Sequence, residues 1–288
     1  MSATASTGGS ALRLFWLAAV FALPCLFILL PMLAFLIYGF WHVEGADIVR
    51  SFSFESYLDF LGNEAYVAVF FRTLALAAKV MVINLVLGYP VALFISSIEG
   101  RMRYYLILAL IVPLLMSYII KIYAMRAILG SKGLLNQALL FLGVLDRPSD
   151  LFLFNMNAVL ITMAVIMLPF MILPIFMALE RIPKSLTDAA ADLGATPWQR
   201  FRDITLPMSL PGAVVGGMFC FVLALGDFLA PELVGGTQGF TFGRAIFSQF
   251  GLAFNWPLGA AMSVVLLIVA LAVIAAAGRI ANPKWQRA

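Results

Sequence analysis

Long apolar runs, separated by short polar stretches, form the pattern of this 288-residue chain. Within each run the apolar residues follow one another directly, without the alternation of apolar and polar positions that membrane β-strands show. A helix needs about 20 such residues to cross a bilayer, and in lipid only helices and closed barrels satisfy their backbone polar groups. The pattern therefore predicts an all-α integral membrane fold with six transmembrane helices, at residues 12–41, 66–97, 104–129, 155–180, 211–231 and 258–280.

Shorter segments complete the predicted organisation. Residues 133–143 are apolar but too short to span, which predicts an interfacial or re-entrant helix, either a packing plug or a functional element. The acidic and aromatic residues 42–65 favour a short element on the outer surface. Outside the membrane domain at 12–280, the polar residues 1–11 predict a disordered N-terminal segment, and residues 281–288 predict a tail.

Basic residues at the ends of the runs predict the orientation of the chain. Loops on the cytoplasmic side of a membrane protein carry an excess of Lys and Arg. One side of the predicted spans is rich in basic residues, whereas on the other side basic residues are diluted by carboxylates such as Glu44, Asp47, Glu55 and Asp59. We therefore expect both termini in the cytoplasm. The basic side includes Arg101, Arg103, Arg181, Lys184, Arg200, Arg279 and Lys284.

Composition excludes several kinds of chemistry. Hydrophobic residues make up 64% of the chain and charged residues only 11%, against about 25% charged residues in a soluble domain. The single histidine, His42, cannot build a multi-histidine metal site, and Cys25 and Cys220 lie inside apolar runs. The chain also has no Walker-type nucleotide loop. We expect no catalytic residue, metal or cofactor in this chain, so a membrane-embedded enzyme is disfavoured and any ATP binds to another polypeptide.

The loop at 182–207, between the fourth and fifth predicted spans, carries the most specific pattern. Ser185 followed by Asp188 resembles a capping box, which predicts a short helix from Leu186. Gly194 supplies a left-handed stop for that helix. The apolar face of the helix consists of Leu186, Ala190 and Leu193.

A second short helix is predicted directly after this stop. Thr196 and Pro197 have the residue types of an N-cap and a first helical position. An apolar stripe follows, made of Trp198, Phe201 and Ile204. The loop is therefore expected to form two small helices joined by a sharp bend at the membrane surface.

This loop resembles the cytoplasmic EAA loop of ABC importer permeases. The resemblance lies in Asp188-Ala189-Ala190, in Gly194 six residues after Asp188, and in Ile204-Thr205-Leu206-Pro207. The usual first residue of the family motif is Glu, and Asp188 keeps its charge. The resemblance implies a type I importer permease fold, in which this loop forms the coupling helix that docks onto an ATPase subunit. It implies that role for Asp188, Ala189, Ala190 and Gly194, and Leu193 on the predicted apolar face is included with them.

Two further stretches resemble permeases of the spermidine/putrescine type. Lys121-Ile-Tyr-Ala-Met-Arg126, followed by Gly133-Leu-Leu-Asn136, is similar to their "RTYAW…GLLN" stretch. Gly226-Asp-Phe-Leu-Ala-Pro-Glu-Leu-Val-Gly-Gly236 is similar to the "GDFVTPELLGG" segment of the first of their two paired subunits. Lys121 stands where Arg is common, which exchanges a bidentate fork for a point charge and leaves the substrate open.

This narrower resemblance implies a multi-pass protein of the bacterial inner membrane that imports a polyamine such as spermidine or putrescine. The implied partners are a second, different permease subunit, two copies of an ATPase that bind ATP and Mg, and a periplasmic solute-binding protein. The alternative is a secondary transporter or channel, which would need coupling carboxylates inside the spans. Asp227 is the one mid-span carboxylate that the pattern offers, so this alternative is disfavoured.

Polar residues within or near the spans are candidates for the translocation pathway, because charges in lipid are costly. Lys79 is expected near mid-depth of the second span, either as a pathway charge or paired with a carboxylate of Asp227 or of a partner subunit. Asn84 fits the same polar strip or an interhelical hydrogen bond. We expect Asp227 and Glu232, near the outer end of the fifth predicted span, either to attract a cationic solute or to hold the geometry of the loop there. The full set of pathway candidates is Lys79, Asn84, Lys121, Asp227 and Glu232.

Gly212 and Gly216 form a small-xxx-small step in the fifth predicted span. Such a step lets a neighbouring helix approach closely. We expect close helix packing there, with channel gating as the alternative.

Overall fold

The computed structural model describes residues 13, 16, 20, 22–23, 25–45, 47–149 and 152–281. Their contacts divide them into two compact units. The described residues of Met1–Asn63 and Ser248–Val265 form the smaller unit, and those of Glu64–Phe247 and Leu266–Ala288 form the larger one. The predicted disordered segment 1–11 and most of the predicted tail lie outside the described residues.

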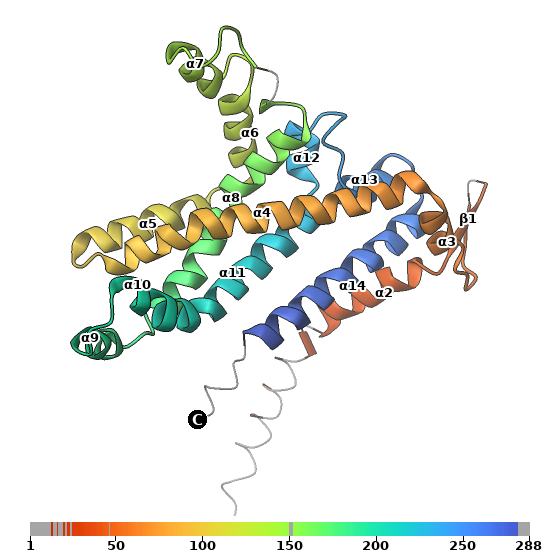
Figure 1. Cartoon of the computed structure of the whole chain (residues 1–288). Coiled ribbons are helices and arrows are strands. Elements are labelled where there is room, and N and C mark those ends of the chain that lie inside the picture. The colour runs from red at the N-terminus through yellow and green to blue at the C-terminus, as the bar shows by residue number, and fades with distance from the viewer. Residues whose placement is uncertain are drawn as a thin grey trace, which may run out of the picture. The chain divides into compact units, whose positions relative to one another are not determined.

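Three long helices form the centre of the larger unit: α4 (Glu64–Ser97), α8 (Met156–Leu179) and α11 (Leu206–Gly226), which pack against one another along their lengths (Figure 1). Each is apolar on nearly all faces, as expected of a helix that meets either protein or lipid. Their shared core contains Ala77, Val80, Met163, Met171, Ile175, Cys220 and Ala224.

Four helices of the described chain are long and apolar enough to cross a membrane, or five if one bent pair counts as a single span. The predicted spans 66–97, 155–180 and 258–280 correspond to α4, α8 and α14 (Trp256–Ile280). The first predicted span is described only in part, as a π-turn η1 (Cys25–Leu29) followed by α2 (Leu30–Tyr38). The predicted number of six spans is therefore not tested.

The predicted span at 104–129 is not one continuous helix. Its residues form α5 (Arg101–Leu115) and α6 (Tyr118–Leu129), and the chain bends by 102° between α5 and the helical segment Tyr118–Phe141. Met116 and Ser117 are extended at this break, with ψ of 147° and 134°. The apolar run continues on both sides of Ser117, so the hydropathy pattern does not reveal the break, although serine is a common N-cap residue. The predicted helix at 133–143 is confirmed as α7 (Leu134–Phe141).

The fifth predicted span, 211–231, starts earlier and ends earlier than expected. α10 (Pro197–Arg200) continues through a π-turn η3 (Phe201–Thr205) into α11, so that Pro197–Gly226 is one helix of 30 residues. The helix stops at Gly226, and a separate α12 (Leu229–Val234) follows.

Gly212 and Gly216 allow α11 to lie directly against α8. A Cβ atom added at Gly212 would come within 2.5 Å of the Pro174 carbonyl oxygen, and one added at Gly216 would meet Met171 at 2.9 Å. Real Cβ contacts are longer, so only glycine permits this approach. The expected close packing is confirmed.

The smaller unit contains α2, a hairpin of β1 (His42–Glu44) and β2 (Asp47–Val49), α3 (Glu55–Gly62) and the beginning of α14. The strands are antiparallel, with His42 opposite Val49. Phe40, Phe52, Phe54 and Tyr57 gather beside the hairpin in ring contacts of 4.9–6.1 Å. The segment 42–65 is therefore a short structured element, as predicted. Helix α13 (Phe242–Gly251) directly precedes α14 in the chain.

Candidate functional site

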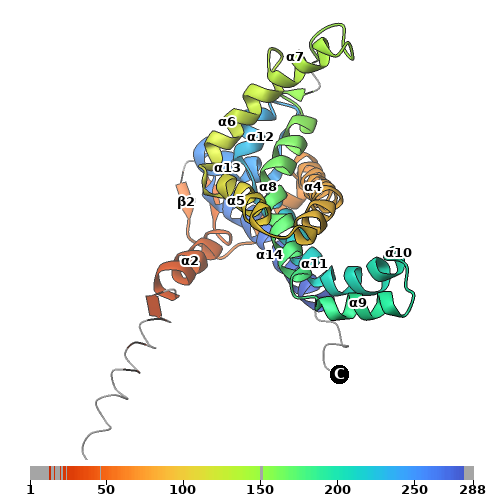
Figure 2. The same ribbon diagram turned by 90° about the vertical axis from the view of Figure 1, so that its left-hand side faces the viewer.

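The loop at 182–207 forms α9 (Lys184–Asp192) and then α10, which lie side by side beyond the end of α11 (Figure 2). The capping box expected from Ser185 is wrong. The helix begins two residues before Leu186, so Pro183 rather than Ser185 is its N-cap. Pro183 makes no side-chain capping hydrogen bond. Asp188 is then the fifth residue of α9 rather than part of its first turn, so it does not stabilise the helix N-terminus.

Gly194 ends α9 in the left-handed conformation, as predicted, with φ of 84°. Gly194 N–H donates to the Ala191 carbonyl at 2.9 Å, and Ala195 N–H donates to the Ala190 carbonyl at 2.9 Å. These two bonds are those of a Schellman motif. No atom lies within 4 Å of a Cβ added at Gly194, so backbone conformation rather than space selects glycine here.

Thr196 caps α10, as predicted, and Pro197 is its first residue. Gln199 completes a capping box: its backbone N–H donates to Thr196 Oγ1 at 3.3 Å, and its side-chain oxygen accepts from the Thr196 backbone at 2.7 Å. Sequence reasoning missed this role of Gln199, although its spacing of three residues from Thr196 was visible. The predicted second helix is not separate, because it runs on into α11.

Three large apolar side chains of the 182–207 loop are exposed, beside charged residues such as Asp188 and Asp192. The exposed fraction is 45% for Leu186, 89% for Leu193 and 67% for Trp198, and no residue of α9 is buried. Asp188 and Ala189 are exposed as well, and Ala190 is half-buried. Exposed large apolar side chains on a short capped helix are typical of a protein-docking surface.

One ion pair connects this loop to the turn between α4 and α5, and a second connects α5 to the end of α8. Lys184 Nζ lies 2.5 Å from Glu99 Oε1, and the Lys184 ammonium lowers the pKa of the Glu99 carboxyl. Arg103 pairs with Glu180 and lies 5.1 Å from the ring centroid of Phe176. Sequence reasoning missed both pairs, because their members are far apart in the chain and no local spacing relates them.

A cavity of about 440 Å³ opens at the other end of α11, between α6, α8, α11 and α12. Tyr118, Lys121 and Asp227 supply its polar groups, and Phe170 and Phe228 are part of its wall. Sequence reasoning had selected Lys121 and Asp227 but missed Tyr118, because a tyrosine in an apolar run is a common interfacial residue.

Asp227 is buried, with an exposed fraction of 8%. Its carboxylate accepts hydrogen bonds from the Tyr118 hydroxyl, from Leu229 N–H at 3.0 Å and from Ala230 N–H at 3.3 Å. The last two bonds hold the start of α12, so Asp227 does shape the loop. Lys121 Nζ lies 5.6 Å from the Tyr118 ring centroid.

The structure separates the other pathway candidates from this cavity. Glu232 forms an ion pair with Arg244, which favours its role in loop geometry. Asn84 is fully buried, and its amide donates to Cys220 Sγ at 3.5 Å. This contact between α4 and α11 favours an interhelical hydrogen bond over a place in the pathway.

Lys79 lines a separate cavity of about 290 Å³, together with Arg72, Met156 and Gln238. The proposed pair of Lys79 with Asp227 is wrong, because the hydrogen-bond partners of that carboxylate lie elsewhere. Lys79 has no ion pair with any residue in the described ranges. Lys79 is near the middle of α4 and shares this cavity with Met156 at the start of α8; its expected depth in the membrane stays a prediction.

Solved structures confirm the fold. A bacterial ABC transporter involved in the import of the acidic polysaccharide alginate has a chain that superimposes with a TM-score of 0.78, at 18% identity, and the match covers 95% of this chain and 96% of that one. The MetNI methionine ABC transporter matches with a TM-score of 0.59 at 20% identity, over 75% of this chain and 94% of that chain.

Named transport proteins are more similar to this chain in sequence than these solved structures are. The spermidine/putrescine transport system permease protein PotB of Escherichia coli K12 is 36% identical over 91% of this chain and 96% of its own length. PotB of Haemophilus influenzae is 33% identical over 93% of this chain and 95% of its own length. A family model matches residues 9–287. The chain therefore belongs to the family of binding-protein-dependent transport system inner membrane components.

Proposed function

We propose that this chain is one of two permease subunits of an ATP-driven importer, and that its solute is a small polyamine cation. The observation that carries the proposal is the α9–α10 loop. This loop exposes Leu186, Leu193 and Trp198, is fixed by a Schellman motif and a capping box, and lies at one end of a 30-residue helix. Such a surface fits a groove on a separate ATPase, with Asp188, Ala189, Ala190, Leu193 and Gly194 as contact and positioning residues.

The relatives support a polyamine as solute, and so does the cavity at Asp227. A carboxylate attracts an ammonium group, and the faces of aromatic rings stabilise cations. The cavity combines Asp227 with Tyr118, Phe170 and Phe228. Lys121 stands in the same cavity, where its ammonium opposes a cation and limits how tightly the solute is held.

The proposed assembly contains a second permease, two ATPase copies that bind ATP and Mg, and a periplasmic solute-binding protein. The membrane domain at 12–280 would have both termini in the cytoplasm, which places the 182–207 loop on the same side as the ATPases. Single cysteines at Ser53, Ser149 and Gln238 should react with an impermeant thiol reagent added outside the cell. Labelling of a cysteine at Gln199 from outside would contradict this orientation.

Transport by the purified complex tests the proposal. Proteoliposomes that contain the complex captured through a tag on this chain, with ATP trapped on the ATPase side, should take up labelled spermidine when the solute-binding protein is added. Liposomes loaded with a non-hydrolysable ATP analogue are the control. Uptake that persists without ATP hydrolysis would instead favour a secondary transporter or channel.

A further inference from the structure

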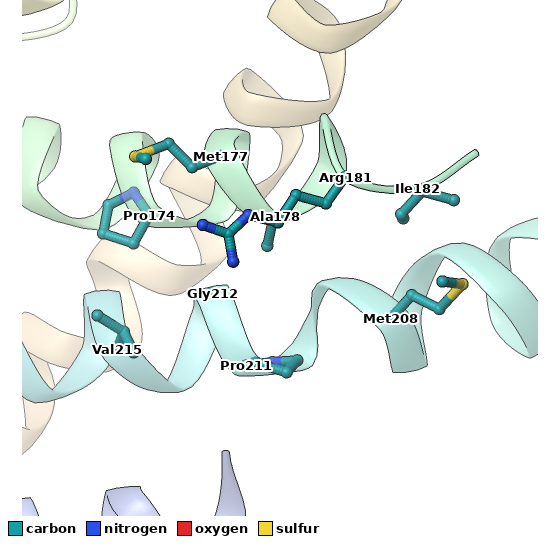
Figure 3. A pocket seen from close by; sticks show the side chains of 9 residues that line it. All are labelled: Pro174, Met177, Ala178, Arg181, Ile182, Met208, Pro211, Gly212 and Val215. Carbon is teal, nitrogen blue, oxygen red and sulfur yellow. The ribbon is translucent and has the colours of Figure 1, made fainter. Parts of the chain in front are cut away.

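The groove between α8 and α11 contains a second cavity, at the end next to the 182–207 loop. It has a volume of about 370 Å³ and is shown in Figure 3. Pro174, Ala178 and Arg181 line it from the α8 side, and Pro211 and Val215 from α11. Apart from Arg181, these side chains are apolar.

Both cavities open on the same face of the two helices. On α8, Phe170 lines the cavity at Asp227, and Pro174 and Ala178 follow at steps of four residues in the second cavity. On α11, Val215 lines the second cavity, and Phe219 is one step of four residues further on. Residues four apart share a helix face. The rings of Phe170 and Phe219, with centroids 6.5 Å apart, therefore lie between the two cavities.

Arg181 gives the second cavity its charge. The residue follows the end of α8, and its side chain turns back along the helix, so that the guanidinium lies beside Ala178 in the space between α8 and α11 (Figure 3). No residue in the described parts of the chain forms an ion pair with Arg181. One end of the groove thus presents the carboxylate of Asp227, and the other end presents an unpaired cation.

We propose that Arg181 is an electrostatic exit filter for cationic solutes. The cavity at Asp227 attracts a cation, whereas the guanidinium of Arg181 repels it from the cavity that opens toward the cytoplasm. The solute therefore leaves that cavity quickly, and cytoplasmic cations do not enter it and block the next cycle. At low ionic strength, a unit charge about 10 Å away at an effective dielectric constant of about 20 changes the affinity for a monovalent cation by about tenfold. Salt reduces this effect, because Arg181 is exposed. This inference rests on the proposed function, because it requires a cationic solute.

Inhibition from the cytoplasmic side tests the filter. Proteoliposomes of the complete complex, with the ATPases inside, are preloaded with ATP and increasing concentrations of unlabelled putrescine, and the initial uptake of labelled spermidine is measured. We expect Arg181→Gln to be inhibited at about tenfold lower internal putrescine than the unsubstituted complex. Arg181→Lys keeps the charge and should behave as the unsubstituted complex does. Arg279→Gln is the matched control, since Arg279 is exposed, belongs to the same predicted basic side, lies outside the 182–207 loop and does not line the cavity.

The outcomes separate the two proposals. If the unsubstituted complex takes up no polyamine, the proposed function fails. If it transports polyamine but Arg181→Gln gives the same internal inhibition curve, the filter is overturned and the function stands. Equal sensitivity of the Lys and Gln variants would also overturn the filter, because the effect would then follow shape rather than charge. Arg181→Met, which keeps the apolar stem, takes the place of Arg181→Gln if the Gln variant does not assemble.

Discussion

Lys184, the first residue of α9, forms an ion pair with Glu99, which lies 85 positions earlier in the chain at the turn between α4 and α5. The pair connects the proposed ATPase-docking loop to a different pair of helices. Because both side chains are largely exposed, solvent and salt weaken the attraction, and the pair serves to align the loop rather than to stabilise the fold.

Glu99→Gln should therefore loosen the coupling between ATP hydrolysis and uptake. We expect fewer solute molecules per ATP at low ionic strength and no difference from the unsubstituted complex at high ionic strength, where the native pair is screened as well. Lys184 holds the pKa of Glu99 below its usual value. The pair is thus fully present above the ordinary pKa of a glutamate and is lost only as the pH falls through the lowered pKa, so coupling near neutral pH should not vary through this group. A difference that persists at high salt would contradict this account.

Gly194→Val should uncouple the complex. A left-handed backbone costs a residue with a side chain about 1–2 kcal/mol, and a β-branched residue more, so the valine variant should redirect α10 relative to α9. ATPase activity of the purified complex should persist while spermidine uptake falls. Gly194→Asn should retain most uptake, because asparagine tolerates the left-handed region.

Gly278→Ala is the control for Gly194, since an added Cβ meets nothing within 4 Å there and φ is not positive. Normal uptake by Gly194→Val would show that the bend between α9 and α10 is not required. Asp188→Ala should have a weaker effect than Gly194→Val, because Asp188 is exposed and does not cap α9.

Gly212→Val should lower the yield and thermal stability of the assembled complex. Even the first carbon of the new side chain would overlap the backbone of α8 at Pro174, and overpacking of this kind typically costs about 1–3 kcal/mol. Gly217→Ala is the matched control on the same helix, because a Cβ there meets Met81 at an ordinary 3.5 Å. Both variants can be compared by size-exclusion chromatography after heating. Equal stability would mean that α8 and α11 separate at no cost.

Asp227→Asn should reduce polyamine uptake while the complex still assembles. Its amide oxygen can still accept the hydrogen bonds from Leu229 and Ala230, so the start of α12 is kept, but the negative charge is lost. A hydrogen bond to a charged group contributes about 1.5–3 kcal/mol, which corresponds to about a tenfold or larger rise in the spermidine concentration needed for half-maximal uptake. An unchanged concentration dependence would limit Asp227 to its structural role.

Sequence patterns predicted the elements that depend on local rules. The left-handed stop at Gly194 and the cap at Thr196 follow from the conformations that these residues favour, and the structure has both. The close approach at Gly212 follows from the absence of a side chain. The break at Met116 and Ser117 was not predicted, because the apolar run continues on both sides of it and the N-cap residue Ser117 was the one local signal.

The sequence patterns also did not predict contacts between segments that are far apart in the chain. Tyr118 reaches Asp227 across 109 positions, and Lys184 reaches Glu99 across 85 positions. Such partners depend on helix packing, which residue spacing along one helix does not determine. The placement of Lys79 beside Met156 depends on helix packing in the same way, and the pattern within α4 alone did not predict it.

The helix Pro197–Gly226 joins the loop to the cavity at Asp227 without interruption. At a rise of about 1.5 Å per residue, it is a rod about 45 Å long. A tilt of only about 5° at its docking end would displace the far end by about 4 Å, roughly the width of an ammonium group with its contacts. The π-turn at Phe201–Thr205 lies close to the docking end, where its irregular hydrogen bonding would let the rod flex under a force from the proposed ATPase.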